Sequence, residues 1–242
     1  MDITGVTAFC GIVLLAAVVQ GVSGFAFGMV VLMVFPYLFG YTSALMLATM
    51  LALILNTANA YIYRNHINWH WIPRWMVVFT VMDLISVLVL KNVGDSPIWY
   101  TLMGAMFILM ACYLLWGQRV LHITTNNRSM FVLASLNGLI MGAFGVGGPI
   151  MAAFLLQATE HKEEYLGTSQ ALGAFVLGVD FIMRAINGMF SLSLLGYSGI
   201  GLIFIVIGLL IAKCLVSHMN ALTMRRIICG VMVLNGIVML SH

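Results

Sequence analysis

Eight long apolar segments, separated by short polar breaks, account for most of this 242-residue chain. About 20 apolar residues in a helix cross the hydrocarbon core of a bilayer. A spanning segment must also satisfy its own backbone hydrogen bonds, which favours helices over an open sheet. The pattern predicts an all-α polytopic membrane protein. The segments cover residues 5–39, 41–63, 72–90, 97–117, 129–156, 164–188, 195–217 and 222–240.

The composition excludes the soluble classes. Charged residues make up 7% of the chain and hydrophobic residues 63%, whereas soluble domains are about 25% charged. This excludes a soluble enzyme, a disordered chain and a nucleic-acid binder. The four cysteines, Cys10, Cys112, Cys214 and Cys229, lie in apolar runs without CxxC spacing and are expected to pack as small hydrophobes. No HExxH motif or Cys/His cluster is present, so we expect no metal and no cofactor.

Two of the eight segments are too long for one crossing. The 35 residues of 5–39 would form a straight helix of about 52 Å, against a hydrocarbon core of about 30 Å. Both long segments carry a glycine cluster, Gly21–Gly28 and Gly138–Gly148, with Pro36 and Pro149 following. Glycine and proline interrupt helices, and we favour a break at each cluster. The alternative is close helix packing through small residues.

The two clusters lie about 121 residues apart, half the length of the chain. This spacing predicts a duplication, with repeat 1 over residues 1–120 and repeat 2 over 121–242, in one integral membrane domain. Each repeat would contain a broken helix and three further helices. In repeat 1 these are 5–39, 41–63, 72–90 and 97–117, and in repeat 2 they are 129–156, 164–188, 195–217 and 222–240.

The ten Lys and Arg residues distinguish two topologies, because cytoplasmic loops carry an excess of positive charge. Eight single crossings would divide them five against five. If each broken segment instead folds back as a hairpin, only Lys91 and Arg184 remain apart from the other eight. We therefore predict two inverted repeats, each a glycine-broken helical hairpin plus three transmembrane helices, with both termini outside the cytoplasm. The eight grouped residues are Arg64, Arg74, Arg119, Arg128, Lys162, Lys213, Arg225 and Arg226. The sequence leaves open whether each hairpin is re-entrant or a pair of short spans.

A helix broken at membrane depth exposes backbone N–H groups and a positive dipole end, which bind anions. Transporters with inverted repeats place such breaks facing each other at the midplane. We therefore expect a small anion between the Gly24–Gly28 and Gly145–Gly148 turns. Nearby polar residues would add hydrogen bonds, although interhelical bonding is an alternative role for them. The candidate binding residues are Ser23, Gly24, Phe25, Gly28, Asn56, Asn59, Gly145, Val146, Gly147, Gly148, Thr168, Ser169, Gln170 and Arg184.

Three ionisable residues lie inside the apolar segments: Asp83, Asp180 and Arg184. Such residues are costly in a membrane and indicate function. Asp180 and Arg184 are four residues apart, so they share a helix face and can pair. They form either a neutralised pair or a site in which Arg184 provides positive charge near the anion. Asp83 has no partner nearby in the sequence, and Asp83 and Asp180 are the candidates for proton coupling.

The glycine motifs resemble those of the TauE/SafE sulfite exporter family. Gly142-Ala-Phe-Gly145-Val-Gly147-Gly148-Pro149 is similar to the family's second-half signature, and Gly167-Thr168-Ser169 to its G-T-S box. The stretch from Gly21 to Pro36 matches the first half more loosely, with fewer glycines. Arg64-Asn65-His66-Ile67-Asn68-Trp69 resembles the family's turn after a basic residue, with Asn68 where aspartate is common.

The resemblance implies secondary transport, with export as the leading direction, of a small anion such as sulfite, an organosulfonate or a related sulfur oxyanion. The partners would be this anion and the lipid bilayer of the inner membrane, with no nucleic acid, and a homodimer is the candidate assembly. A passive anion channel and a small-carboxylate permease are the alternatives. An intramembrane enzyme is a remote one, because only Asp83, Asp180 and Arg184 could serve as catalytic groups.

Overall fold

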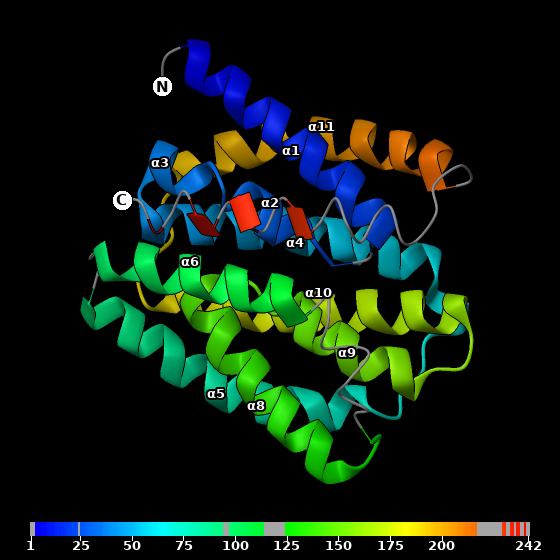
Figure 1. The fold of residues 1–242 in the computed structure, drawn as a ribbon. Coiled ribbons are helices and arrows are strands. Elements are labelled where there is room, and N and C mark those ends of the chain that lie inside the picture. Colours follow the sequence, from blue (N-terminus) through cyan, green and yellow to red (C-terminus); the bar gives the residue numbers. More distant parts are fainter. Residues whose placement is uncertain are drawn as a thin grey trace.

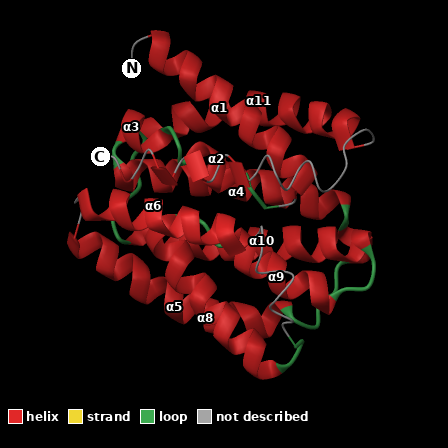
Figure 2. Cartoon of the chain, viewed as in Figure 1, coloured by secondary structure: helices red, strands yellow, loops and turns green. Residues whose placement is uncertain are grey.

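The computed structural model describes residues 3–23, 25–93, 97–113 and 124–216, together with residues 229, 230, 233, 234, 236, 237 and 240. Helices make up this part of the chain almost entirely, and it contains no strand (Figures 1 and 2). The prediction of an all-α fold is confirmed for the described residues. The predicted segment 222–240 lies mostly outside them.

Both long apolar segments are interrupted at their glycine clusters. Residues 5–39 form α1 (Ile3–Ser23), α2 (Phe27–Val31) and α3 (Phe35–Phe39), and residues 129–156 form α8 (Asn127–Phe144) and α9 (Gly148–Ala158). Gly145 ends α8 in the left-handed region with φ of 67°, and its N–H donates to the Met141 carbonyl at 2.8 Å. This is the usual glycine termination of a helix. Pro149 then lies in the first turn of α9, where a missing N–H is tolerated.

The remaining described helices are longer and uninterrupted. They are α4 (Tyr41–Ile62), α5 (Ile72–Val93), α6 (Pro97–Cys112), α10 (Lys162–Ile186) and α11 (Ser193–Val216), with a short 3₁₀ turn, η1 (Arg64–His66), after α4. Among the described residues, five helices are long and apolar enough to cross a membrane. Large apolar side chains such as Val77, Leu109 and Leu210 are more than half exposed, as lipid-facing residues are. The protein is therefore a multi-pass membrane protein.

The helices pair across the two halves of the chain. In Figure 1, α1 packs on α11 at the top, α5 packs on α8 at the bottom, and α4 and α10 pack together between them. Tyr41 and Lys162, which begin α4 and α10, are 121 residues apart, and so are Ile72 and Ser193, which begin α5 and α11. By this spacing α1 corresponds to α8, α4 to α10 and α5 to α11. The α1–α11 pair therefore corresponds to the α8–α5 pair, and the α4–α10 pair corresponds to itself. A twofold relation between the halves would produce this pattern.

The turn after α4 and the starts of α5, α8 and α10, which carry Arg64, Arg74, Arg128 and Lys162, lie at one end of the helices, on the right of Figure 1. The turn after α4 meets the start of α10, because the Asn68 amide donates to a Glu164 carboxylate oxygen at 2.7 Å. The start of α5 meets the start of α8, because Arg74 donates to the side chain of Asn127 at 3.2 Å. Lys162, at the start of α10, therefore lies at the same end as Arg64. Eight single crossings would have placed these two residues at opposite ends.

Candidate anion-binding site

The two interrupted stretches meet each other inside the molecule. A Cβ atom added to Gly28 would lie 2.9 Å from the Gly145 carbonyl oxygen, and one added to Gly148 would lie 2.7 Å from the Phe25 carbonyl oxygen. Phe25 and Gly145 are 120 residues apart, and so are Gly28 and Gly148. The contact is therefore reciprocal, and at both points only glycine lets one backbone approach the other this closely.

A cavity of about 60 Å³ lies where the two breaks meet. One water needs at least about 10–15 Å³ of such space, so the cavity has room for several waters or for one small oxyanion. Each half of the chain supplies part of the wall, and none of the described residues that line it is charged. The lining residues are Gln20, Phe25, Phe27, Gly28, Met29, Ala52, Asn56, Asn137, Met141, Gly145, Val146, Gly147, Gly148, Met151, Gly173, Val176 and Leu177.

Three buried amide side chains supply the polar part of the wall. Gln20 on α1 accepts a hydrogen bond from the Phe27 N–H at 2.9 Å, which links α1 to α2 across the first break. Asn137 on α8 donates to the Gly147 carbonyl at 2.9 Å and accepts from the Trp75 indole at 3.2 Å, which links α8 to the start of α9. Asn56 on α4 donates to the Ala52 carbonyl at 2.8 Å. Each break is thus held by an amide from the helix before it.

The start of α9 offers backbone donors. Ile150 and Met151 donate back to the Gly147 carbonyl at 3.2 and 3.3 Å. Within the described residues, no oxygen accepts a hydrogen bond from the N–H groups of Val146, Gly147 or Gly148. Unpaired N–H groups at a helix start carry partial positive charge. At the other break the corresponding N–H, that of Phe27, already donates to the Gln20 side chain. The positive end of the cavity therefore lies at the start of α9.

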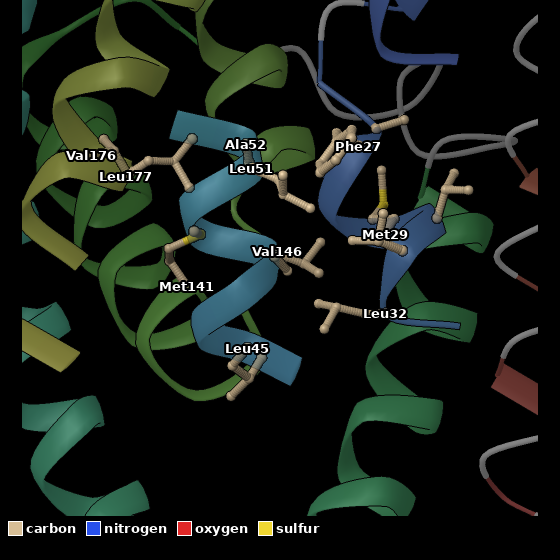
Figure 3. Close-up of a cluster of buried hydrophobic side chains, with 14 of the residues drawn as sticks. Phe27, Met29, Leu32, Leu45, Leu51, Ala52, Met141, Val146, Val176 and Leu177 are labelled. Atoms are coloured by element: carbon tan, nitrogen blue, oxygen red, sulfur yellow. The ribbon is translucent and has the colours of Figure 1, made fainter. Parts of the chain in front are cut away.

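The rest of the wall is apolar. Figure 3 shows Phe27 and Met29 on α2, Val146 between α2 and α4, and Val176 and Leu177 on α10. All five of these side chains are less than 9% exposed. An apolar wall lowers the local dielectric, which strengthens hydrogen bonds from the N–H groups to a bound anion.

Arg184 lies outside the cavity, at the end of α8. Its Nε donates to both Asp180 carboxylate oxygens at 2.8 Å, and its Nη2 donates to the carbonyls of Met141 at 3.0 Å and Gly142 at 2.8 Å. The hydroxyl of Thr49 on α4 donates to Asp180 at 2.8 Å. The guanidinium therefore neutralises Asp180 and caps the last carbonyls of α8, where the helix dipole is negative.

Asp83 lies beside this pair. Its side chain is fully buried, and no described group donates a hydrogen bond to either of its carboxylate oxygens. It approaches the pair at Gly142 on α8: a Cβ atom added to Gly142 would lie 3.1 Å from Asp83 Oδ1, and the Gly142 carbonyl accepts from Arg184. The three ionisable residues that the sequence places inside the membrane are thus together.

The other candidates are distributed as follows. Of the fourteen candidate binding residues, the cavity is lined by Phe25, Gly28, Asn56, Gly145, Val146, Gly147 and Gly148. Asn59 is buried in α4 away from the cavity. Thr168, Ser169 and Gln170 are buried in α10 and also do not line it; Thr168 accepts from the Asn68 N–H at 2.9 Å, and Ser169 donates to the Leu166 carbonyl at 3.2 Å. Ser23 ends α1, and Gly24 lies outside the described residues.

Sequence reasoning did not select Gln20 and Asn137. Both are lone amides in otherwise apolar stretches, and each lies eight residues before a glycine at its break, Gly28 for Gln20 and Gly145 for Asn137. A buried amide needs a partner, and a broken helix has unpaired backbone groups close by. An amide within two turns of a predicted break was therefore the signal that could have identified these residues.

Replacing Gln20 by methionine should weaken the first break. The variant keeps the side-chain length but leaves the buried Phe27 N–H without its acceptor, a loss of about 1–3 kcal/mol. We expect a lower unfolding temperature in detergent than for wild type. Gln157→Met, the same change at an exposed position of α9, should unfold close to wild type. Equal unfolding temperatures for Gln20→Met and wild type would show that this bond does not stabilise the break.

Apolar helices long enough to cross the bilayer, with two broken helices meeting at an internal cavity, define a polytopic membrane protein with a candidate site for a small ligand. The family model of the sulfite exporter TauE/SafE matches residues 9–239, nearly the whole chain. The chain belongs to this family, as its motifs indicated, and the members of the family are transporters. Searches of curated proteins and of solved structures found no match.

Proposed function

We propose that the chain is a secondary transporter that exports a small anion, such as sulfite, an organosulfonate or a related sulfur oxyanion, across the inner membrane. The observation that carries the proposal is the cavity between the two breaks. Its backbone donors at Val146, Gly147 and Gly148 have no acceptor among the described residues, and its lining includes no carboxylate. Such a site favours an anion through its N–H groups. Because none of the described lining residues is a cation, the anion can also leave. The family to which the chain belongs supports sulfite as the first anion to test.

Inverted repeats give this site two-sided access. Repeat 2 contributes most of the wall, and repeat 1 contributes Gln20, Phe25, Phe27, Gly28, Met29, Ala52 and Asn56. Movement of one repeat against the other would open the cavity to one side of the membrane at a time. The grouping of Arg64, Arg74, Arg128 and Lys162 at one end supports a cytoplasmic position for that end, with both termini outside.

Counterflow in proteoliposomes tests this function. Vesicles loaded with unlabelled sulfite should take up labelled sulfite transiently above its external concentration, because a carrier exchanges internal for external substrate. Methanesulfonate, which stays ionised at neutral pH, serves as a second substrate, and protein-free vesicles give the background. If labelled anion only equilibrates, the protein is a channel. If neither anion moves, the proposed substrate class is wrong.

A negative charge in the cavity should weaken anion binding. Asn56→Asp keeps the side-chain size but places a carboxylate in the wall. Two like charges about 4 Å apart repel by about 4 kcal/mol at an effective dielectric of about 20, so we expect the KM for sulfite to rise by more than about a hundredfold. The measurement is initial uptake against sulfite concentration.

Asn59→Asp is the matched control for this substitution. Asn59 lies on the same helix, one turn further, and is similarly buried, at 8% exposure against 6% for Asn56, but it does not line the cavity. We expect its KM to stay close to that of wild type. Equal KM values for the two variants would place the anion elsewhere.

A further inference from the structure

Asp83, Asp180 and Arg184 form a buried charged cluster next to the cavity but outside its wall. All three side chains have an exposed fraction of 0%. They come from α5 and α10, and α8 packs against both at this point through Gly138 and Gly142 on one side and the Arg184 contacts on the other. The uncharged polar groups nearby are the hydroxyls of Thr49, which donates to Asp180, and Tyr41, which donates to the Ala143 carbonyl at 2.8 Å.

The charges in this cluster do not balance. Two carboxylates face one guanidinium, which leaves a net charge of −1 if both acids are ionised. Arg184 directs its Nε to Asp180 and its Nη2 to two carbonyls, and Asp83 receives no hydrogen bond from the described residues. A buried carboxylate without a donor is costly, and like charges close together cannot both remain ionised readily. One added proton makes the cluster neutral.

We propose that Asp83 and Asp180 share one exchangeable proton that is carried together with the anion. This inference rests on the proposed function and adds the coupling ion to it. The proton would bind when the cluster is reached from one side of the membrane and leave when it is reached from the other. One proton with one monovalent anion moves no net charge, so the direction of transport depends only on the gradients of the proton and of the anion. An outward gradient of the anion would drive export, and an acidic outer side would drive uptake.

The contacts of Arg184 connect this proton to the cavity. Arg184 holds the Met141 and Gly142 carbonyls at the end of α8, and Met141 also lines the cavity and accepts the N–H of Gly145. The Arg184 Nη1 group has no acceptor among the described residues. When the proton leaves, the ionised Asp83 competes for the guanidinium and draws it from α8. The position of the second break thereby depends on whether the proton is bound.

Infrared spectroscopy tests for the shared proton without any substrate. A protonated carboxyl gives a C=O stretching band that a carboxylate lacks. We expect this band in wild type at neutral pH and its loss in both Asp83→Asn and Asp180→Asn, because either change leaves a single carboxylate beside Arg184. Its persistence in both variants, or its absence from wild type, would overturn the inference whatever the outcome of transport assays.

Transport with a pH gradient tests the coupling. For one proton per anion, wild-type vesicles with the acidic side outside should accumulate methanesulfonate by about tenfold per pH unit. Asp83→Asn should keep counterflow exchange but lose this accumulation. Ser86→Ala is the control, because Ser86 lies on the same helix and donates to the Leu139 carbonyl at 2.7 Å but carries no charge; it should keep the accumulation.

These assays distinguish a failure of the shared-proton proposal from a failure of the proposed transport function. Accumulation by Asp83→Asn equal to that of wild type would overturn the shared proton and leave the anion transporter intact. Absence of counterflow with both sulfite and methanesulfonate in wild type would overturn the proposed function itself.

Discussion

Gly147→Ala should reduce sulfite counterflow by at least about tenfold while the protein still inserts and purifies. The backbone at Gly147 has φ of −114° and ψ of −14°, which alanine can adopt, so strain in the chain is not the reason. The added methyl group would instead overlap the Asn137 amide, which holds the Gly147 carbonyl. Displacing that amide leaves buried polar groups unpaired, at about 1–3 kcal/mol, and shifts the N–H groups at the start of α9.

Gly11→Ala provides the matched control. It makes the same chemical change within α1, where an added Cβ meets nothing within 4 Å. Alanine is also favoured over glycine inside a helix, so this variant should exchange sulfite at the wild-type rate. If Gly147→Ala and Gly11→Ala behave alike, close packing at the second break does not matter for transport.

Arg184→Met should lower the stability of the protein more than Gln20→Met or Gly147→Ala. It removes the partner of Asp180 and the donor to the Met141 and Gly142 carbonyls together. Removing one member of a buried ion pair typically costs about 3–5 kcal/mol. We expect low yield and a clear fall in unfolding temperature, measured by size-exclusion chromatography after heating in detergent.

The double variant Asp180→Leu/Arg184→Met separates charge from packing. Replacing both members of a buried pair by apolar residues is often neutral or stabilising, so the double variant should recover much of the lost stability. It should not recover proton-driven accumulation, because the carboxyl partner of Asp83 is gone. A double variant as unstable as Arg184→Met would mean that the bonds to α8, and not the unpaired Asp180, account for the loss.

The helices and their breaks follow from local properties of the sequence. The excess length of 5–39 and 129–156, together with their glycines, indicated interruptions, and the structure has them between α1 and α2 and between α8 and α9. The spacing of four between Asp180 and Arg184 indicated a pair, and the two are bonded at 2.8 Å. In both cases a few consecutive residues carry the signal, so no knowledge of the packing was needed.

Tertiary contacts could not be predicted in the same way. Thr168 was a candidate ligand residue because of its position in the G-T-S box, but its hydroxyl accepts from the Asn68 N–H, 100 residues away in the sequence. The approach of Gly28 to Gly145 and the neighbours of Asp83 likewise depend on how the two halves dock. A glycine or a buried acid indicates that something lies close to it, but the sequence does not say what.

Anomalous diffraction from crystals soaked in selenite tests the anion site most directly, because selenite has the pyramidal shape of sulfite and its selenium atom can be located on its own. We expect one selenium peak in the cavity between Phe25–Gly28 and Gly145–Gly148, within hydrogen-bonding distance of the N–H groups of Gly147 and Gly148. A peak beside Arg184, or none in this cavity at concentrations that saturate transport, would contradict it.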